Sequence, residues 1–111
     1  MEKNWRVTAF LFSGRPDPQW LLKKKQADHF MSLWNQATVS NKEAIIPSRL
    51  GYRGIKVLTE KKQWLIYDSV ITGKEEEIKT SKTDEGKIIE KFLLNTAPEE
   101  ILKLFRKVNL L

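Results

Sequence analysis

The first stretch of alternating apolar and polar side chains predicts a strand over residues 5–12. Val7 and Ala9 share one face of it, with a polar residue between them. Alternation with a period of two is typical of a half-buried strand. Phe10 and Phe12 add apolar groups to the opposite face, so we expect this strand to be central in its sheet or covered by a helix at one end.

The period changes to about 3.6 over residues 23–37, which predicts an amphipathic helix. Its apolar stripe is formed by Ala27, Phe30, Met31, Trp34 and Ala37. Residues 38–51 show no period, and Pro47 argues against a central strand among them. We therefore expect an irregular segment after the helix.

A β-hairpin is predicted next. Residues 52–59 and 64–72 are two largely apolar runs, and the polar residues 60–63 join them. A charged turn is expected over residues 73–77. Residues 78–81 then predict a short edge strand, because lysine and threonine suit an exposed edge.

The end of the chain predicts two helices. Thr83 or Asp84 can cap the first. Pro98, followed by two glutamates, is a favourable start for the second. The apolar faces of these helices contain Ile88, Ile89, Phe92 and Leu93, and Ile101, Leu102, Phe105 and Val108.

The predicted order is strand, helix, strand, strand, a further short strand, helix and helix. This order favours an α+β fold, in which helices pack on a small, mainly antiparallel sheet of three to four strands. A length of 111 residues suits a single domain over residues 1–111. Apolar residues make up 41% of the chain, which is too many for a disordered protein.

Composition excludes several kinds of site. The chain has no cysteine, so disulfides, thiolate metal sites and thiol catalysis are excluded. Its single histidine, His29, cannot form a histidine metal cage within one chain, and we expect it at a helix surface. No apolar run approaches the roughly 20 residues of a membrane span, and the first residues do not resemble a signal peptide. We therefore expect a cytoplasmic protein with no membrane partner, cofactor or metal.

Positive charge is concentrated in the first part of the chain. Residues 1–64 contain 12 Lys or Arg and 5 Asp or Glu, whereas residues 65–111 contain 8 and 9. Lysines at a helix start oppose the helix dipole, which suggests contact with phosphate. One hypothesis is therefore a nucleic-acid-binding protein, and the alternative is a solvated basic face. The candidate residues are Lys23, Lys24, Lys25, Lys61 and Lys62.

Catalytic motifs are absent: the sequence has no phosphate-binding loop, dinucleotide fingerprint, calcium loop or metalloprotease helix. Asp17 and Asp68 are the carboxylates that a small enzyme would use as a base. Nothing in their spacing places them together, so this hypothesis ranks below the two binding hypotheses.

Two segments combine glycine, arginine and an aromatic residue, namely residues 13–20 and 50–54. Glycine permits close backbone approach, and arginine offers a planar set of donors to carboxylate or phosphate. If the strands beside them pair antiparallel, both segments lie at one edge of the sheet. The predicted binding residues are Arg15, Asp17, Trp20, Tyr52 and Arg53. The structural alternative is that Arg15 or Arg53 pairs with Asp17, while Trp20 and Tyr52 fill the end of the sheet.

These segments also carry a family resemblance. Residues 12–20 (FSGRPDPQW), 50–54 (LGYRG) and 92–97 (FLLNTA) resemble a small family of uncharacterised bacterial proteins. The resemblance implies a bacterial origin but no activity, because none is established for that family. Its members tend to begin the helix after the tryptophan with serine or threonine, whereas this chain has Leu22 and three lysines.

The sequence thus favours a non-enzymatic binding or accessory module, such as an inhibitor or immunity-type protein. Its partner would be a protein or an anionic ligand held by the two arginine-containing loops. The nucleic-acid-binding protein and the small enzyme are the alternatives.

Overall fold

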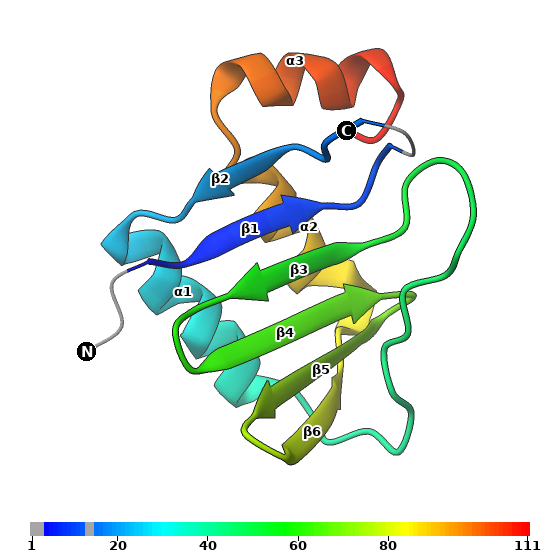
Figure 1. Cartoon of the computed structure of the whole chain (residues 1–111). Coiled ribbons are helices and arrows are strands. Elements are labelled where there is room, and N and C mark those ends of the chain that lie inside the picture. The colour runs from blue at the N-terminus through cyan, green and yellow to red at the C-terminus, as the bar shows by residue number, and fades with distance from the viewer. Residues whose placement is uncertain (1–3, 13–14) are drawn as a thin grey trace.

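The computed structural model describes residues 4–12 and 15–111 and shows an α+β fold. Six antiparallel strands form one sheet, and helices pack against it (Figure 1). The elements are β1 (Arg6–Ala9), β2 (Gln19–Leu21), α1 (Lys24–Gln36), β3 (Ile55–Leu58), β4 (Lys62–Tyr67), β5 (Val70–Glu75), β6 (Ile78–Thr83), the 3-10 turn η1 (Glu85–Lys87), α2 (Ile88–Asn95) and α3 (Glu99–Lys107).

The sheet has the order β2-β1-β3-β4-β5-β6, and each strand pairs antiparallel with its neighbours. The prediction of three to four strands was therefore too low, and the predicted element order lacks two strands. The predicted hairpin is confirmed as β3 and β4, and the predicted edge strand is confirmed as β6.

One missing strand arises from a turn inside the predicted strand at residues 64–72. Asp68 and Ser69 both adopt positive φ angles, 51° and 66°. Two such residues between the paired Tyr67 and Val70 form a two-residue hairpin turn, which separates β4 from β5. Glycine and asparagine normally mark this turn, so Asp68 and Ser69 give no clear signal for it. Gly73, Lys74 and Glu75, predicted as a charged turn, consequently belong to β5.

The other missing strand is β2, which lies in the segment predicted to be a stiff loop. The two prolines precede the strand rather than interrupt it, and the backbone pairs again from Gln19 to Leu21. Trp20 points into the core, with 6% of its surface exposed. A strand of three residues is too short to show an alternating pattern.

The core lies on one face of the sheet. The register places Val7, Val57, Trp64 and Gly73 in one row across β1, β3, β4 and β5. Figure 1 shows α1 and α2 behind the sheet and α3 beyond β2. Phe30 of α1 and Phe105 of α3 are fully buried, so these members of the predicted helical stripes belong to the core. Ile88 and Val108, also predicted on the apolar faces, are 57% and 43% exposed, because they lie at the first residue of α2 and just after α3.

The opposite face is covered in part by the irregular segment between α1 and β3. Its Ala44 N–H donates to Thr72 Oγ1 at 2.8 Å, and the Arg49 guanidinium lies 5.8 Å from the centre of the Tyr67 ring. Before this crossing, Val39 forms a single bridge with Lys82 on the outer edge of β6. This segment therefore closes part of the sheet edge and part of the second face.

The residues predicted to begin the last two helices, Asp84 and Pro98, do lie at or near the starts of α2 and α3. The Asp84 carboxylate accepts hydrogen bonds from the main-chain N–H groups of Ile89 and Glu90, at 2.7 and 3.0 Å. Pro98 directly precedes α3 as its N-cap residue. Within the described part of the chain, no helix has the length and hydropathy needed to cross a membrane. The cytoplasmic location stays a prediction.

Candidate functional site

The two arginine-containing loops meet, because β1 and β3 pair antiparallel. The Phe10 N–H donates to the Gly54 carbonyl at 2.9 Å, and the Arg53 N–H donates to the Phe10 carbonyl at 2.7 Å. Gly54 has a φ of +100°, and a Cβ at this position would collide with the Ile66 carbonyl oxygen. Glycine is thus required here for the close approach of two backbones. Residues 13 and 14 lie outside the described residues.

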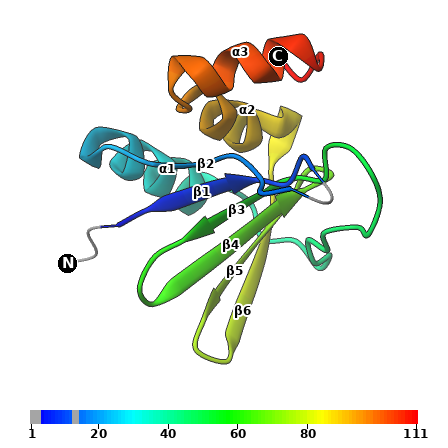
Figure 2. The ribbon, with the colours of Figure 1, turned by 45° about the horizontal axis from the view of Figure 1, so that its top comes forward.

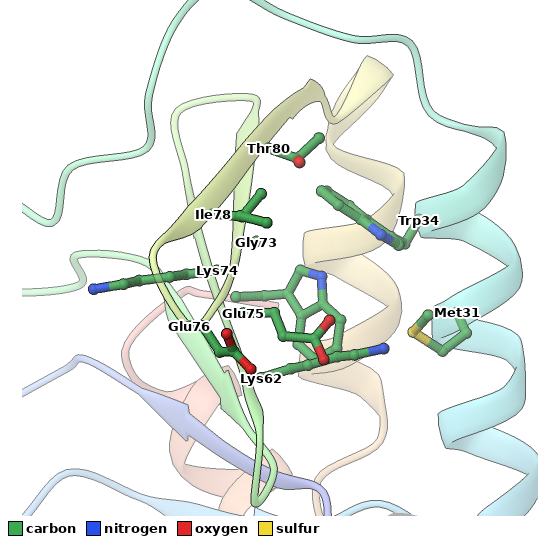
Figure 3. Close-up of a pocket in the computed structure, with 10 residues that line it drawn as sticks. Met31, Trp34, Lys62, Gly73, Lys74, Glu75, Glu76, Ile78 and Thr80 are labelled. Atoms are coloured by element: carbon green, nitrogen blue, oxygen red, sulfur yellow. The ribbon is translucent and has the colours of Figure 1, made fainter.

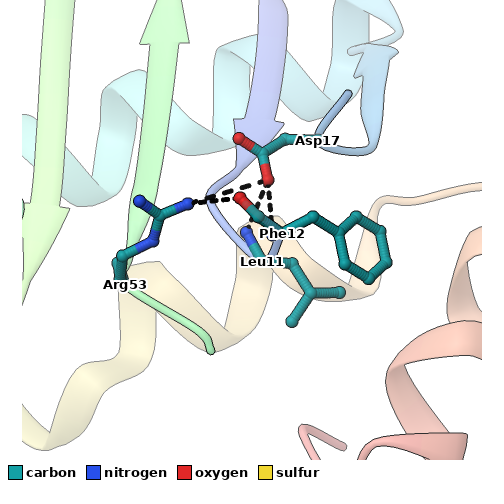
Figure 4. Close-up of polar contacts among 4 residues, drawn as sticks. All are labelled: Leu11, Phe12, Asp17 and Arg53. Carbon is teal, nitrogen blue, oxygen red and sulfur yellow. Dashed lines mark hydrogen bonds and ion pairs between the residues drawn. The ribbon is translucent and has the colours of Figure 1, made fainter. Parts of the chain in front are cut away.

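Asp17 and Arg53 bind the end of β1 from both sides (Figure 4). Oδ1 of Asp17 accepts the main-chain N–H groups of Leu11 and Phe12 at 2.8 and 2.7 Å. Arg53 Nη2 donates to the Phe12 carbonyl at 2.7 Å and lies 4.0 Å from Asp17 Oδ1. Both side chains are mostly buried, with 17% and 18% exposed, so their polar groups are directed at the protein itself. We call this set the Asp17–Arg53 clamp.

Trp20 and Tyr52 also direct their polar atoms inward. Trp20 Nε1 donates to Thr96 Oγ1 at 2.9 Å, and its ring packs edge-on against Phe105. The Tyr52 hydroxyl donates to Glu90 Oε2 at 2.5 Å. Burial, reinforced by this hydrogen bond, raises the pKa of Tyr52, so the phenol stays protonated and remains a donor.

Sequence reasoning missed the buried carboxyl groups beside Tyr52. Asp84 is 1% exposed and Glu90 is 7% exposed. Burial raises the pKa of each, although the two main-chain hydrogen bonds to Asp84 and the Tyr52 hydroxyl at Glu90 act in the opposite direction. Asp84 was predicted only as a helix cap, and a glutamate inside a helix gives no sign that it is buried.

Arg15 differs from the other four predicted binding residues because it is exposed. Its guanidinium carbon lies 3.7 Å from the centre of the Phe12 ring, which is a stacked cation–π arrangement. The geometry thus brings Asp17 and Arg53 together, buries Trp20 and half-buries Tyr52 against the core, and leaves Arg15 facing solvent. Binding by these residues stays a prediction.

The predicted nucleic-acid-binding lysines lie toward one end of the sheet. Arg6 of β1 pairs with Leu21, which precedes α1, and with Leu58, which precedes the β3–β4 turn. The lysines at 23–25 and Lys61 therefore lie toward this end of the sheet. Lys24 forms an exposed ion pair with Asp28 at 3.1 Å. Lys62 instead lines the groove described below.

The predicted acid–base candidates occupy different settings. Asp17 belongs to the clamp described above. Asp68 is exposed in the β4–β5 turn and borders a hollow of about 630 Å³ with Ser40 and Asn41. His29 is exposed on α1, and its ring lies edge-on to Phe92 at 4.6 Å. The described residues contain no group of three or more histidine or acidic side chains that could hold a metal ion.

A second cavity, of about 320 Å³, opens between α1 and the β5–β6 hairpin (Figure 3). Met31 and Trp34 line it from α1, and Ile78 and Thr80 line it from β6. Ile78 is 72% exposed and lines the same cavity as Trp34 and Trp64. We call this cavity the tryptophan groove. Its lining is completed by Lys62, Trp64, Gly73, Lys74, Glu75 and Glu76.

Gly73 allows the two indole rings to pack directly against β5. A Cβ on Gly73 would lie 3.0 Å from Trp64 Nε1 and 3.2 Å from Trp34 Cζ2. The two indole rings pack edge-to-face at 6.3 Å, and Lys82 Nζ lies 4.3 Å from the centre of the Trp34 ring. Trp64 is 2% exposed, and its Nε1–H is one of the buried donors that lack a partner among the described residues.

The sequence contained one signal for this groove. A glycine inside a strand often marks the close approach of another group. Gly73 was assigned to a turn, however, and Trp34 and Trp64 were assigned to core-facing patterns. Nothing in the local pattern shows that α1 leaves part of the β5–β6 hairpin uncovered.

Comparisons with protein-family models, curated proteins and solved structures gave no match to this chain. The family resemblance of the loop segments therefore stays a prediction, and the functional argument depends on the site geometry.

Proposed function

We propose that this chain is a non-enzymatic binding module and that the tryptophan groove is its binding site. The observation that carries the proposal is a cavity in which an exposed isoleucine, Ile78, faces Trp34. Met31 and Trp64 add apolar surface to its lining, and four charged side chains complete it. Ligand sites are typically concave, mostly apolar and supplied with a few polar groups. Here Lys62 and Glu75 provide polar groups at the rim, and the Trp64 N–H is a buried donor beneath it.

The groove is suited to an aromatic or long aliphatic side chain. Burying such a group contributes about 1.5–3 kcal/mol, and packing against indole rings adds to it. An inhibitor or immunity-type protein would use this kind of contact with its target. The exposed Arg15 lies outside the groove and would belong to a separate contact.

A titration with p-cresol, followed by the indole N–H signals in ¹⁵N–¹H NMR spectra, tests this proposal. The signals of Trp34 and Trp64 should shift, whereas that of Trp20, which is bonded to Thr96, should not. Replacing Ile78 with alanine should weaken p-cresol binding about fivefold, which corresponds to ~1 kcal/mol of lost contact.

The matched control is Ile88→Ala, which also removes an exposed isoleucine but lies on α2. Its affinity for p-cresol should equal that of the wild type. An absence of any indole shift at millimolar p-cresol, or equal losses in the two alanine variants, would refute the groove as a binding site.

A second function, nucleic-acid binding, is supported by one observation. The register brings the lysines at 23–25, Lys61 and Arg6 to the same end of the sheet. Such a basic end would attract a phosphate backbone without sequence preference. Among the described residues of this surface no aromatic side chain is fully exposed, so we expect the binding to be mainly electrostatic.

A further inference from the structure

Only half of β6, the edge strand beside the tryptophan groove, is paired on its outer side. Ser40 N–H donates to the Ser81 carbonyl, and Thr83 N–H donates to the Thr38 carbonyl, both at 2.8 Å. The segment at residues 38–40 thus already pairs with the second half of β6 as an extra piece of extended chain. The first half of β6, residues 78–80, projects beyond this segment.

The free part of this edge can accept another strand. Hydrogen-bonding groups alternate between the two sides of a strand, so Lys79 directs its N–H and C=O to the same outer side as Ser81 and Thr83. Among the described residues, neither of these two Lys79 groups has a main-chain partner outside the β5–β6 pairing. Figure 2 shows the tip of the β5–β6 hairpin projecting away from the helices. An incoming chain therefore has access to it.

The alternation of side chains links this edge to the groove. Ile78 and Thr80 point into the tryptophan groove, whereas Lys79 points to the other face, where Nζ bonds Glu43 Oε2 at 3.0 Å. A strand placed against Lys79 would direct every second side chain toward Trp34 and the groove. Extended peptides are recognised at sheet edges in this way: the main chains pair, and pockets take every second side chain of the peptide.

We infer, on the basis of the proposed function, that the occupant of the groove is an extended peptide segment of a partner protein. The segment pairs with the outer edge of β6 at Lys79, in line with residues 38–40, and inserts one aromatic or long aliphatic side chain between Ile78 and Trp34. A second copy of this chain is a poorer occupant, because pairing of two β6 edges about Lys79 brings like charges opposite each other.

Peptides selected from a display library of random linear sequences provide the probe. Lys79→Pro removes the outward N–H without removing a bond to β5, because proline is tolerated at an edge position that faces solvent. Lys79→Ala is the matched control, since it loses the same ion pair with Glu43 but keeps the N–H. The selected peptides should bind the proline variant about five- to tenfold more weakly than the alanine variant, as loss of a main-chain hydrogen bond and a steric clash imply.

Hydrogen exchange adds a readout that does not depend on the variants. In the wild type, the Lys79 amide should exchange its hydrogen more slowly when a selected peptide binds. The indole N–H signals of Trp34 and Trp64 should shift in the NMR spectrum of the same complex. Some selected peptides should bind the Ile78→Ala variant more weakly than the wild type. If these peptides bind Lys79→Pro and Lys79→Ala with equal affinity, strand pairing is overturned and the groove remains a binding site. Binding of p-cresol but of no peptide would overturn the inference alone, and binding of neither would overturn the proposed function as well. Dimerisation of the wild type that is lost with Lys79→Pro would identify a second copy as the occupant and overturn the partner peptide.

Discussion

The Asp17–Arg53 clamp should contribute to the stability of the protein, and this contribution can be measured as a change in the free energy of unfolding. Replacing Asp17 with alanine removes the acceptor of two main-chain N–H groups, those of Leu11 and Phe12, which it holds at 2.8 and 2.7 Å. It also leaves the mostly buried Arg53 guanidinium without a counter-ion. Leu11 and Phe12 then lose their main-chain hydrogen bonds to Asp17.

The magnitude follows from these contacts. A hydrogen bond to a charged group contributes about 1.5–3 kcal/mol. The two bonds share one oxygen, and water can reach part of the released groups, so we expect a total loss of about 2–4 kcal/mol in the free energy of unfolding. Asp17→Asn keeps an oxygen acceptor and loses only the charge, and we expect about 1–2 kcal/mol for it. Arg53→Glu places a second acid beside Asp17 and should cost about 3–5 kcal/mol, as breaking a buried pair does.

Urea unfolding followed by tryptophan fluorescence measures these losses, and hydrogen exchange at the Leu11 and Phe12 amides locates them. Arg15→Glu is the matched control, because Arg15 is exposed and contacts only the Phe12 ring in the described structure. It should change the free energy of unfolding by less than about 0.5 kcal/mol. The reasoning is refuted if Asp17→Ala is as stable as the wild type, or if Arg15→Glu and Arg53→Glu are equally destabilised.

The remaining predictions concern pH, a turn and charge. Burial raises the pKa values of Asp84 and Glu90, so the folded state keeps protons at pH values where the unfolded state has lost them. The free energy of unfolding should therefore fall as pH rises above the usual carboxyl pKa of about 4. Glu90→Gln should make this fall smaller in urea unfolding at several pH values, whereas an unchanged slope would contradict the assignment. Ser69→Gly should stabilise the protein by about 0.5–1 kcal/mol in urea, because Ser69 has a φ of 66°; a loss of stability would contradict the turn assignment. Replacing the three lysines at 23–25 with glutamine should lower the slope of log K against log salt for a DNA duplex by about 2–3, if those lysines contact phosphate; an unchanged slope, or no duplex binding by the wild type at low salt, would remove this surface.

Much of the fold follows from local pattern. The helix predicted at residues 23–37 is α1 within one residue at each end, because its stripe from Ala27 to Trp34 has a helical period and faces the sheet. The β3–β4 hairpin follows for the same reason, since alternation places Ile55, Val57 and Trp64 on one side. In these segments the periodicity of the apolar residues and the tertiary packing require the same conformation.

In the elements that the sequence did not predict, local pattern and tertiary packing do not require the same conformation. At Asp68 and Ser69 the chain turns through positive φ angles that these residue types adopt at a cost, and the cost is offset by the six paired residues on each side of the turn. The pattern of residues 64–72 is compatible with one long strand, and only the pairing of β5 with β6 selects the hairpin. Long-range pairing of this kind cannot be obtained from a local window.

The candidate site could not be predicted from local pattern for the same reason. The loops whose composition attracted the functional prediction direct most of their polar groups inward: Asp17 and Arg53 bind the end of β1, and Tyr52 binds Glu90. The groove, by contrast, is made from residues that resemble core positions. Trp34 and Trp64 line a cavity because Ile78 and Thr80 of β6 lie across it from α1, and because Gly73, without a side chain, allows both indole rings to pack against β5. The proposed binding surface depends on how the helix and the hairpin lie relative to each other. It can therefore be recognised only after the helix and the hairpin have been placed in space.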